Sequence, residues 1–181
     1  MKFRNIVVAG DAGTGTTTLA RSLAAKLHLK YISAGDFFRQ YALEHNIPLW
    51  DKAAVPDKVD REVDNKFTEM MKNDSGYIFD SHYGGYFARD MGDNFKVLLT
   101  CDPKTAEERI IARDHTHQET PEEIRKRRAG IVAKFKKLYS GENHENPNFF
   151  DLIIDTTETN TEKTLEKVIN RLKNWNSNLE L

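Results

Sequence analysis

One short segment near the start of the chain limits the possible folds more than any other. Residues 3–9 form an apolar run that is rich in β-branched side chains, which predicts a buried strand. Glycines follow at once in residues 10–15, and residues 16–27 then carry leucine at every fourth position, as in an amphipathic helix. The chain therefore begins with a strand, a glycine-rich turn and a helix.

The same alternation continues along the rest of the chain. Apolar runs predict four more strands, at residues 29–33, 76–80, 94–100 and 149–155. Periodicity and capping signals predict five further helices. Two of them run from the N-cap candidate Asp36 to about residue 45 and over residues 56–72. The other three begin at Pro103, begin at Thr120 with its T-x-x-E capping box, and cover the last apolar stripe up to Trp175. Strands that alternate with helices predict an α/β fold of three layers, with a five-stranded parallel sheet and helices on both faces.

Composition narrows the class of protein further. The 181 residues are 39% hydrophobic, and 27 Lys+Arg against 28 Asp+Glu leave a net charge of -1, so a disordered chain or a polyanion-binding surface over the whole protein is excluded. We expect a single domain and a monomer. The single cysteine, Cys101, excludes an intrachain disulfide, and the apolar run at residues 6–9 is too short for a signal or a membrane span. We therefore expect a cytoplasmic location, with no membrane partner and no nucleic acid.

The glycine-rich turn has the spacing of a phosphate-binding P-loop. Its G-x-x-x-x-G pattern ends in a hydroxyl residue, but Thr16 stands where such loops usually have lysine. Backbone amides and the positive end of the following helix still favour an anion. The candidate phosphate-binding residues are Gly10, Asp11, Ala12, Gly13, Thr14, Gly15, Thr16, Thr17 and Thr18. A glycine-rich turn without a ligand is the alternative.

Two oxygen-bearing side chains are candidates for a Mg²⁺ site. Thr17 holds the position of the hydroxyl that binds Mg²⁺ in P-loops, and Asp80 ends a hydrophobic strand as a Walker B acid does. Taken alone, Asp80 also fits a turn residue at the end of a strand.

Several segments together are similar to the cytidylate kinase-like family of P-loop nucleoside monophosphate kinases, and to its short archaeal-type branch in particular. The resemblance covers nearly the whole chain, and it depends on GDAGTGTTTLARSLAAKL, YISAGDFFRQYALEHNIPL, DKVDREVD, IFDSHYGG, AEERIIAR and FFDLIIDTT. It implies a P-loop NTPase fold, ATP as phosphoryl donor, Mg²⁺, and CMP or dCMP as acceptor.

The resemblance also implies roles for particular residues. The acceptor region would span about residues 34–75, with Ser33, Asp36 and Arg39 at the acceptor nucleotide. A basic lid would span about residues 113–140. Arg109 would lie near adenine, and the implied catalytic residues are Arg113, Arg127, Lys134 and Asp80.

The chief departure from the family follows Asp80. The family usually has glycine and arginine there, whereas this chain has Ser81 and His82, followed by Tyr83. We expect His82 and Tyr83 to contact the acceptor, although the tyrosine ring is as compatible with packing in the core. Because the usual lysine and arginine are missing, two alternatives stay open: a kinase for another small phosphoacceptor, or an ATP-binding module that contacts RNA or protein through its basic helix.

Overall fold

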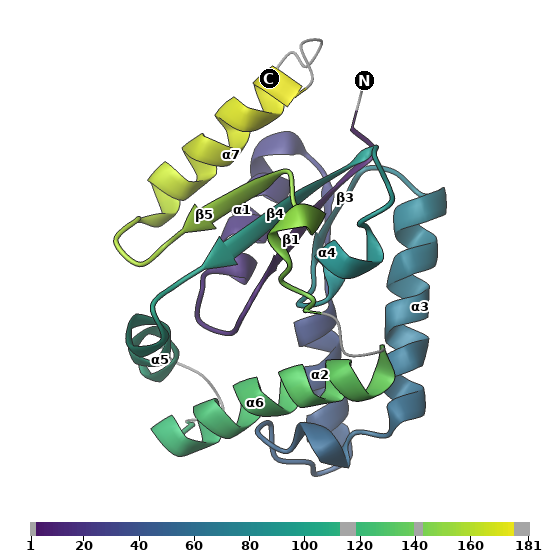
Figure 1. The fold of residues 1–181 in the computed structure, drawn as a ribbon, viewed down its shortest axis with the longest axis vertical. Coiled ribbons are helices and arrows are strands. Elements are labelled where there is room, and N and C mark those ends of the chain that lie inside the picture. The colour runs from purple at the N-terminus through teal and green to yellow at the C-terminus, as the bar shows by residue number, and fades with distance from the viewer. Residues whose placement is uncertain (1–2, 113–118, 140–142, 176–181) are drawn as a thin grey trace.

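The structure is a computed structural model that describes residues 3–112, 119–139 and 143–175 (Figure 1). Its centre is a five-stranded sheet in the order β2-β3-β1-β4-β5, and every neighbouring pair is parallel. The strands are β1 (Asn5–Gly10), β2 (Lys30–Ser33), β3 (Tyr77–Asp80), β4 (Asn94–Thr100) and β5 (Leu152–Asp155). The predicted sheet is confirmed. The fifth strand starts later than predicted, because Pro147–Phe149 form a short 3-10 helix before it.

Alternating side chains of the strands supply two separate cores. Ile6 and Val8 point to the face covered by α1 (Thr16–Leu27) and α7 (Thr161–Trp175). Val7 points to the opposite face, which is covered by α2 (Ala34–Glu44) and α3 (Asp57–Asn73). Because strand side chains alternate and both faces are buried, the runs are apolar throughout. The three-layer arrangement is therefore as predicted.

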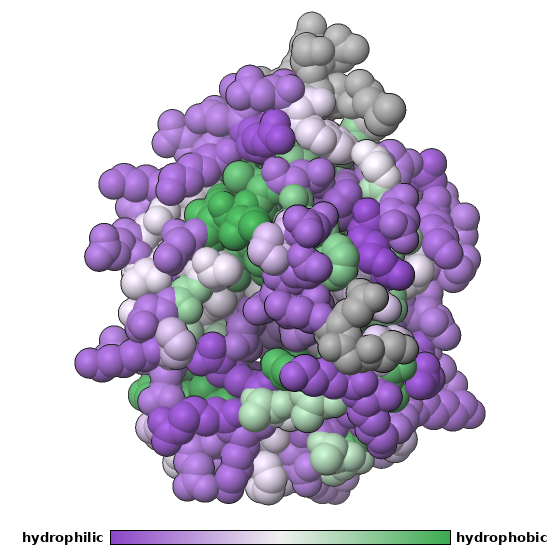
Figure 2. Space-filling view, in the orientation of Figure 1, coloured by the Kyte–Doolittle hydropathy of each residue, from purple (hydrophilic) through white to green (hydrophobic). Residues whose placement is uncertain are grey.

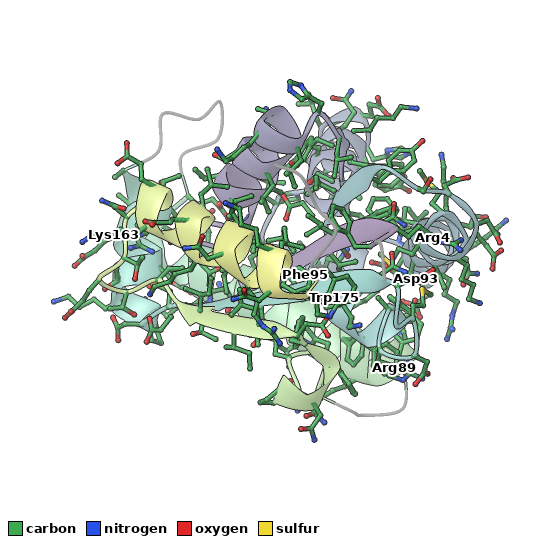
Figure 3. The ribbon with its side chains drawn as sticks, turned by 90° about the horizontal axis from the view of Figure 1, so that it is seen from above. Arg4, Arg89, Asp93, Phe95, Lys163 and Trp175 are labelled. Atoms are coloured by element: carbon green, nitrogen blue, oxygen red, sulfur yellow. The ribbon has the colours of Figure 1, made fainter. Side chains whose placement is uncertain are left out.

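The last helix closes one edge of the first core. Figure 3 shows Trp175 at the end of α7 beside Phe95 of β4, and the two ring centroids lie 5.2 Å apart. Apolar surface gathers over β5 in Figure 2, where Ile153 is 43% exposed. Within the described part of the chain, no helix has both the length and the apolar character that a membrane crossing needs.

The described residues also contain the helices α4 (Gly84–Phe87), α5 (Pro103–Ile111) and α6 (Pro121–Leu138), and a short 3-10 helix, Lys52–Ala54. The predicted capping box of α6 is confirmed, because Thr120 and Glu123 bond each other's backbone N–H groups. The prediction that Asp36 caps α2 is wrong. Ser33 is the N-cap, its Oγ accepts from the N–H of Asp36, and the helix begins at Ala34. Figure 1 shows α6 lying across the edge of the sheet where the strands end.

Candidate active site

The glycine-rich loop lies between β1 and α1, at the middle of the sheet. Gly13 has a φ of +88°, and a Cβ on it would lie 2.4 Å from the carbonyl oxygen of Ala106 in α5. Only glycine tolerates both conditions, so the loop packs directly against α5. Gly15 is the N-cap of α1, and it has no side chain that could accept from the first turn. The helix N-terminus is therefore open to an anion.

Thr17 and Asp80 meet as expected. Thr17 Oγ1 donates to Asp80 Oδ2 at 2.8 Å, and the hydroxyl of Tyr31 donates to the same oxygen at 3.2 Å. Hydroxyl and carboxylate oxygens are the ligands that Mg²⁺ prefers, and they fit a site completed by phosphate and water. Groups of three or more His, Cys, Asp or Glu that could enclose a metal by themselves are absent from the residues that the structure describes.

The ring of His82 contacts the backbone of the glycine-rich loop. Its Nδ1 lies 2.7 Å from the carbonyl oxygen of Gly10, so Nδ1 must carry the proton that is donated. Burial lowers the pKa of His82, which keeps the ring neutral near pH 7. A neutral ring protonated on Nδ1 presents an acceptor at Nε2, which cannot donate to a phosphate. His82 therefore holds the loop through Nδ1, and its contact with the acceptor stays a prediction, since its side chain lines both cavities described below.

Arg39 and Asp36 lie at the start of α2. Arg39 Nη2 is 2.5 Å from Asp36 Oδ1, and the second oxygen of Asp36 is 3.3 Å from Arg21. Asp36 orients Arg39, but Asp36 itself lines neither of the two cavities that are described in the next paragraph. The ion pair does not remove Arg39 from the site, because its side chain lines both of those cavities.

Two cavities meet at this point of the molecule. The loop cavity is lined by the glycine-rich loop and reaches Asp80, whereas the acceptor cavity runs between α2, α3 and α6. Both include Gly35, Arg39, Ser81, His82 and Arg127. Two arginine side chains thus border the junction, where phosphate groups from two ligands could approach each other.

A third cavity lies on the other side of the loop. It is lined by Gly13, Thr14, Gly15 and Thr18 together with Arg109. The guanidinium of Arg109 donates to the carbonyl oxygen of Thr156 at 2.7 Å, which fixes its orientation. The structure therefore brings Arg109 next to the loop, and its position near adenine stays a prediction.

The basic helix α6 is largely neutralised by carboxylates of the same chain. Ion pairs join Arg125 to Glu107, Lys126 to Glu122, Arg127 to Glu119, Arg128 to Asp11, Lys134 to Asp57 and Asp60, and Lys137 to Asp57. Arg128 contacts the loop directly, with Nε 2.5 Å from Asp11 Oδ2. Sequence analysis did not single out Arg128, because its partner lies 117 positions away.

One expected site residue, Lys134, lies away from the cavities, Tyr83 lines the acceptor cavity although its ring packs against the core, and Arg113 cannot be placed. Lys134 was expected at the phosphates, but its ammonium is buried between Asp57 and Asp60 and donates to the carbonyl oxygen of Val55. Tyr83 was expected to contact the acceptor. Its ring is 5% exposed and packs on Phe135, and its hydroxyl donates to the carbonyl oxygen of Ile131. Arg113 lies outside the described residues.

Comparison with known proteins identifies the family of the chain. Residues 6–133 match a protein family described as an AAA domain. The cytidylate kinase of Archaeoglobus fulgidus is 31% identical, over 91% of this chain and 92% of its own length. That of Sulfolobus acidocaldarius is also 31% identical, over 84% and 85%. That of Methanosphaera stadtmanae is 28% identical, over 93% and 98%.

Solved structures agree in fold. A gluconokinase from Sinorhizobium meliloti superimposes with a TM-score of 0.66 at 15% identity, covering 98% of this chain and 97% of that chain. A shikimate kinase from Acinetobacter baumannii superimposes with a TM-score of 0.63 at 14% identity, covering 98% and 96%. These identities are low, so they support the α/β architecture alone. With relatives at 31% identity over most of its length, the chain belongs to the cytidylate kinase family.

Proposed function

We propose that this protein transfers the γ-phosphoryl group of ATP to CMP or dCMP, with Mg²⁺ bound at Thr17 and Asp80. The observation that carries the proposal is the junction of the loop cavity and the acceptor cavity at Arg39 and Arg127. Two cavities that meet at two guanidinium groups are suited to two nucleotides whose phosphates must touch. The printed names of the relatives supply the identity of the acceptor.

The donor nucleotide would lie along the glycine-rich loop. Its triphosphate would bind the N–H groups at the start of α1, which Gly15 leaves without a side-chain cap. The adenine would occupy the cavity beside Arg109. Mg²⁺ held by Thr17 and Asp80 would supply positive charge to the β- and γ-phosphates.

The acceptor phosphate would lie at Arg39, whose planar fork matches two phosphate oxygens. An oxygen of CMP attacks the γ-phosphorus, the bond from that phosphorus to the β–γ bridging oxygen breaks, and the products are CDP and ADP. The attacking oxygen needs no general base, because a phosphate monoester is largely doubly ionised above its second pKa of about 6. Arg39 and Arg127 thus act by alignment and charge neutralisation.

The acceptor panel tests this proposal directly. The purified protein is given ATP, Mg²⁺ and one of CMP, dCMP, UMP, AMP or GMP, and ADP release is followed by a coupled assay. CMP and dCMP should have the largest kcat/KM, and ATP without acceptor should give little ADP. A protein that releases ADP with none of the five acceptors would refute the proposal.

The alternative of an RNA-contacting module loses its motivation in the structure. That alternative followed from the missing lysine and arginine and needed the cations of α6 as its contact surface, but the ion pairs above neutralise most of those cations. Lys136 is the exception, because it pairs with no carboxylate in the described part of the chain. One free lysine gives little electrostatic attraction to a polyanion.

A further inference from the structure

The acceptor cavity has a polar group away from Arg127, because Asp64 bonds Tyr139, which lies 12 positions after Arg127, or about 18 Å along the axis of α6. Along α2 the lining runs from Gly35 to Ala42, which is about 10 Å of helix axis. Beyond the phosphate end, the walls are mainly apolar: Phe38, Ala42, Ile47, Pro48, Leu49, Val55 and Ile131. Three ionisable side chains interrupt these walls, Asp51, Lys52 and Asp64.

Two of the three are already engaged. Lys52 Nζ lies 2.7 Å from Asp60 Oδ1 and 3.4 Å from the centre of the Phe38 ring, so its charge is balanced by Asp60, and an ammonium group can only donate hydrogen bonds. Asp51 Oδ1 accepts from the N–H of Ala54 and caps the short helix that begins there. Lys52 is therefore a donor and Asp51 is only half-buried, so neither of them is a buried hydrogen-bond acceptor in the cavity wall.

Asp64 differs from both. The residue is 4% exposed, and its Oδ2 accepts from the hydroxyl of Tyr139 at 2.6 Å. Among residues 3–112, 119–139 and 143–175, no group donates to Oδ1 of Asp64. Oδ1 is thus accessible from the cavity that Asp64 lines, where a ligand or water can donate to it. Because the residue is nearly buried and its other oxygen is already bonded, this wall favours a ligand that donates a hydrogen bond.

The surroundings of Asp64 determine its charge. Burial raises its pKa to about 6, while Tyr139, Lys52 and Arg61 act in the opposite direction. The carboxyl group is therefore mostly ionised at pH 7.5, and an ionised carboxylate can only accept hydrogen bonds.

We propose that Asp64 accepts a hydrogen bond from the exocyclic amino group on C4 of the acceptor base, and thereby selects cytosine over uracil. The inference rests on the function proposed above and names the residue that sets its specificity. Uracil has an oxygen at C4, so two acceptors would face each other and neither could be satisfied. Sites built to bond a polar group strongly reject analogues that lack it.

The first experiment changes the substrate and leaves the protein intact. The wild-type enzyme is given CMP, UMP, and the monophosphate of the pyrimidin-2-one riboside, which is CMP without its amino group. We expect kcat/KM for CMP to exceed that of each analogue by about 10- to 100-fold. Equal values for CMP and the deaminated analogue would overturn the role of Asp64, although the kinase itself would stand. Loss of turnover with every acceptor would instead refute the proposed function.

The second experiment compares two buried carboxylates of α3. Asp60 lies one turn before Asp64 and is fully buried, but it does not line the acceptor cavity. Asp64→Asn gives the site a donor that suits O4 of uracil, so the ratio of kcat/KM for CMP to that for UMP should fall at least tenfold. Asp60→Asn should change stability and leave this ratio alone. An unchanged ratio in Asp64→Asn, or an equal fall in Asp60→Asn, would overturn the inference.

Discussion

The glycine-rich loop and the acceptor cavity are neighbours, but contacts of different range build them. Within the loop, the backbone N–H of Thr14 donates to the carbonyl oxygen of Asp11, and Ala12 donates to the side chain of Asp11. At the acceptor cavity, Tyr139 bonds Asp64 over 75 positions, and Lys134 bonds Val55 over 79. The turn of the loop is therefore formed by local contacts, and His82 and Arg128 only add to it from elsewhere, whereas the acceptor cavity depends throughout on α6 docking against α3.

The buried ion pairs of Lys134 provide the strongest test of that dependence. Lys134→Met leaves Asp60 buried with less positive charge beside it, and breaking a buried pair costs about 3–5 kcal/mol. Thermal and urea unfolding measure the loss. Lys136→Met changes an exposed lysine of the same helix and should stay within about 0.5 kcal/mol of wild type. A catalytic lid cation would behave differently: kcat would fall while stability remained.

Gly13 gives the corresponding test on the loop side. Gly13→Ala forces alanine to a φ of +88° and places its Cβ against the carbonyl of Ala106. The backbone strain alone should cost about 1–3 kcal/mol, and ATP affinity should fall as the loop shifts. Gly92→Ala is the matched control, because a Cβ at Gly92 meets open space. Equal stability of the two variants would show that the loop does not need its glycine there.

These two regions also differ in how far the sequence predicts them. The strands, the α6 capping box and the Thr17–Asp80 pair are predicted correctly, because each follows from residues close in sequence or from a motif that fixes its own geometry. The position of Lys134 is not predicted correctly. Spacing places it on the same side of α6 as Arg127, but only the docking of α3 shows that two carboxylates hold it. Asp64 has no sequence signal of its own, since its role depends on a cavity between three helices.

Arg39 tests whether the acceptor cavity and the loop bind separate ligands. Arg39→Ala removes a guanidinium from the phosphate end, so KM for CMP should rise about 10- to 100-fold while KM for ATP stays near wild type. Arg21→Ala is the control, because Arg21 also pairs with Asp36 but lines neither the loop cavity nor the acceptor cavity. Steady-state kinetics with each substrate varied in turn measures both constants. An unchanged KM for CMP would contradict the assignment.

Arg128 connects the two regions, because it extends from α6 to Asp11 of the loop. Without Arg128, the carboxylate of Asp11 would have no partner and would repel phosphates bound at the loop. Arg128→Ala should raise KM for ATP about five- to tenfold, and adding Asp11→Asn should restore it, since the repelling charge is then gone. Failure of the second substitution to rescue ATP binding would mean that Arg128 acts through some other contact.

The smallest expected effect is a change of base selectivity with pH. The pKa of Asp64 is raised to about 6, so at pH 5.5 only about a quarter of the carboxyl groups are ionised. A protonated carboxyl can donate to O4 of uracil, so the ratio of kcat/KM for CMP to that for UMP should fall about fourfold from pH 7.5 to 5.5. The nucleotide phosphates titrate in the same range, but they do so equally for both substrates and cancel in the ratio. The ratio in Asp64→Asn should stay flat with pH. A wild-type ratio that is equally flat would show that the base does not meet the carboxylate of Asp64, even if the phosphate end of the cavity behaves as expected.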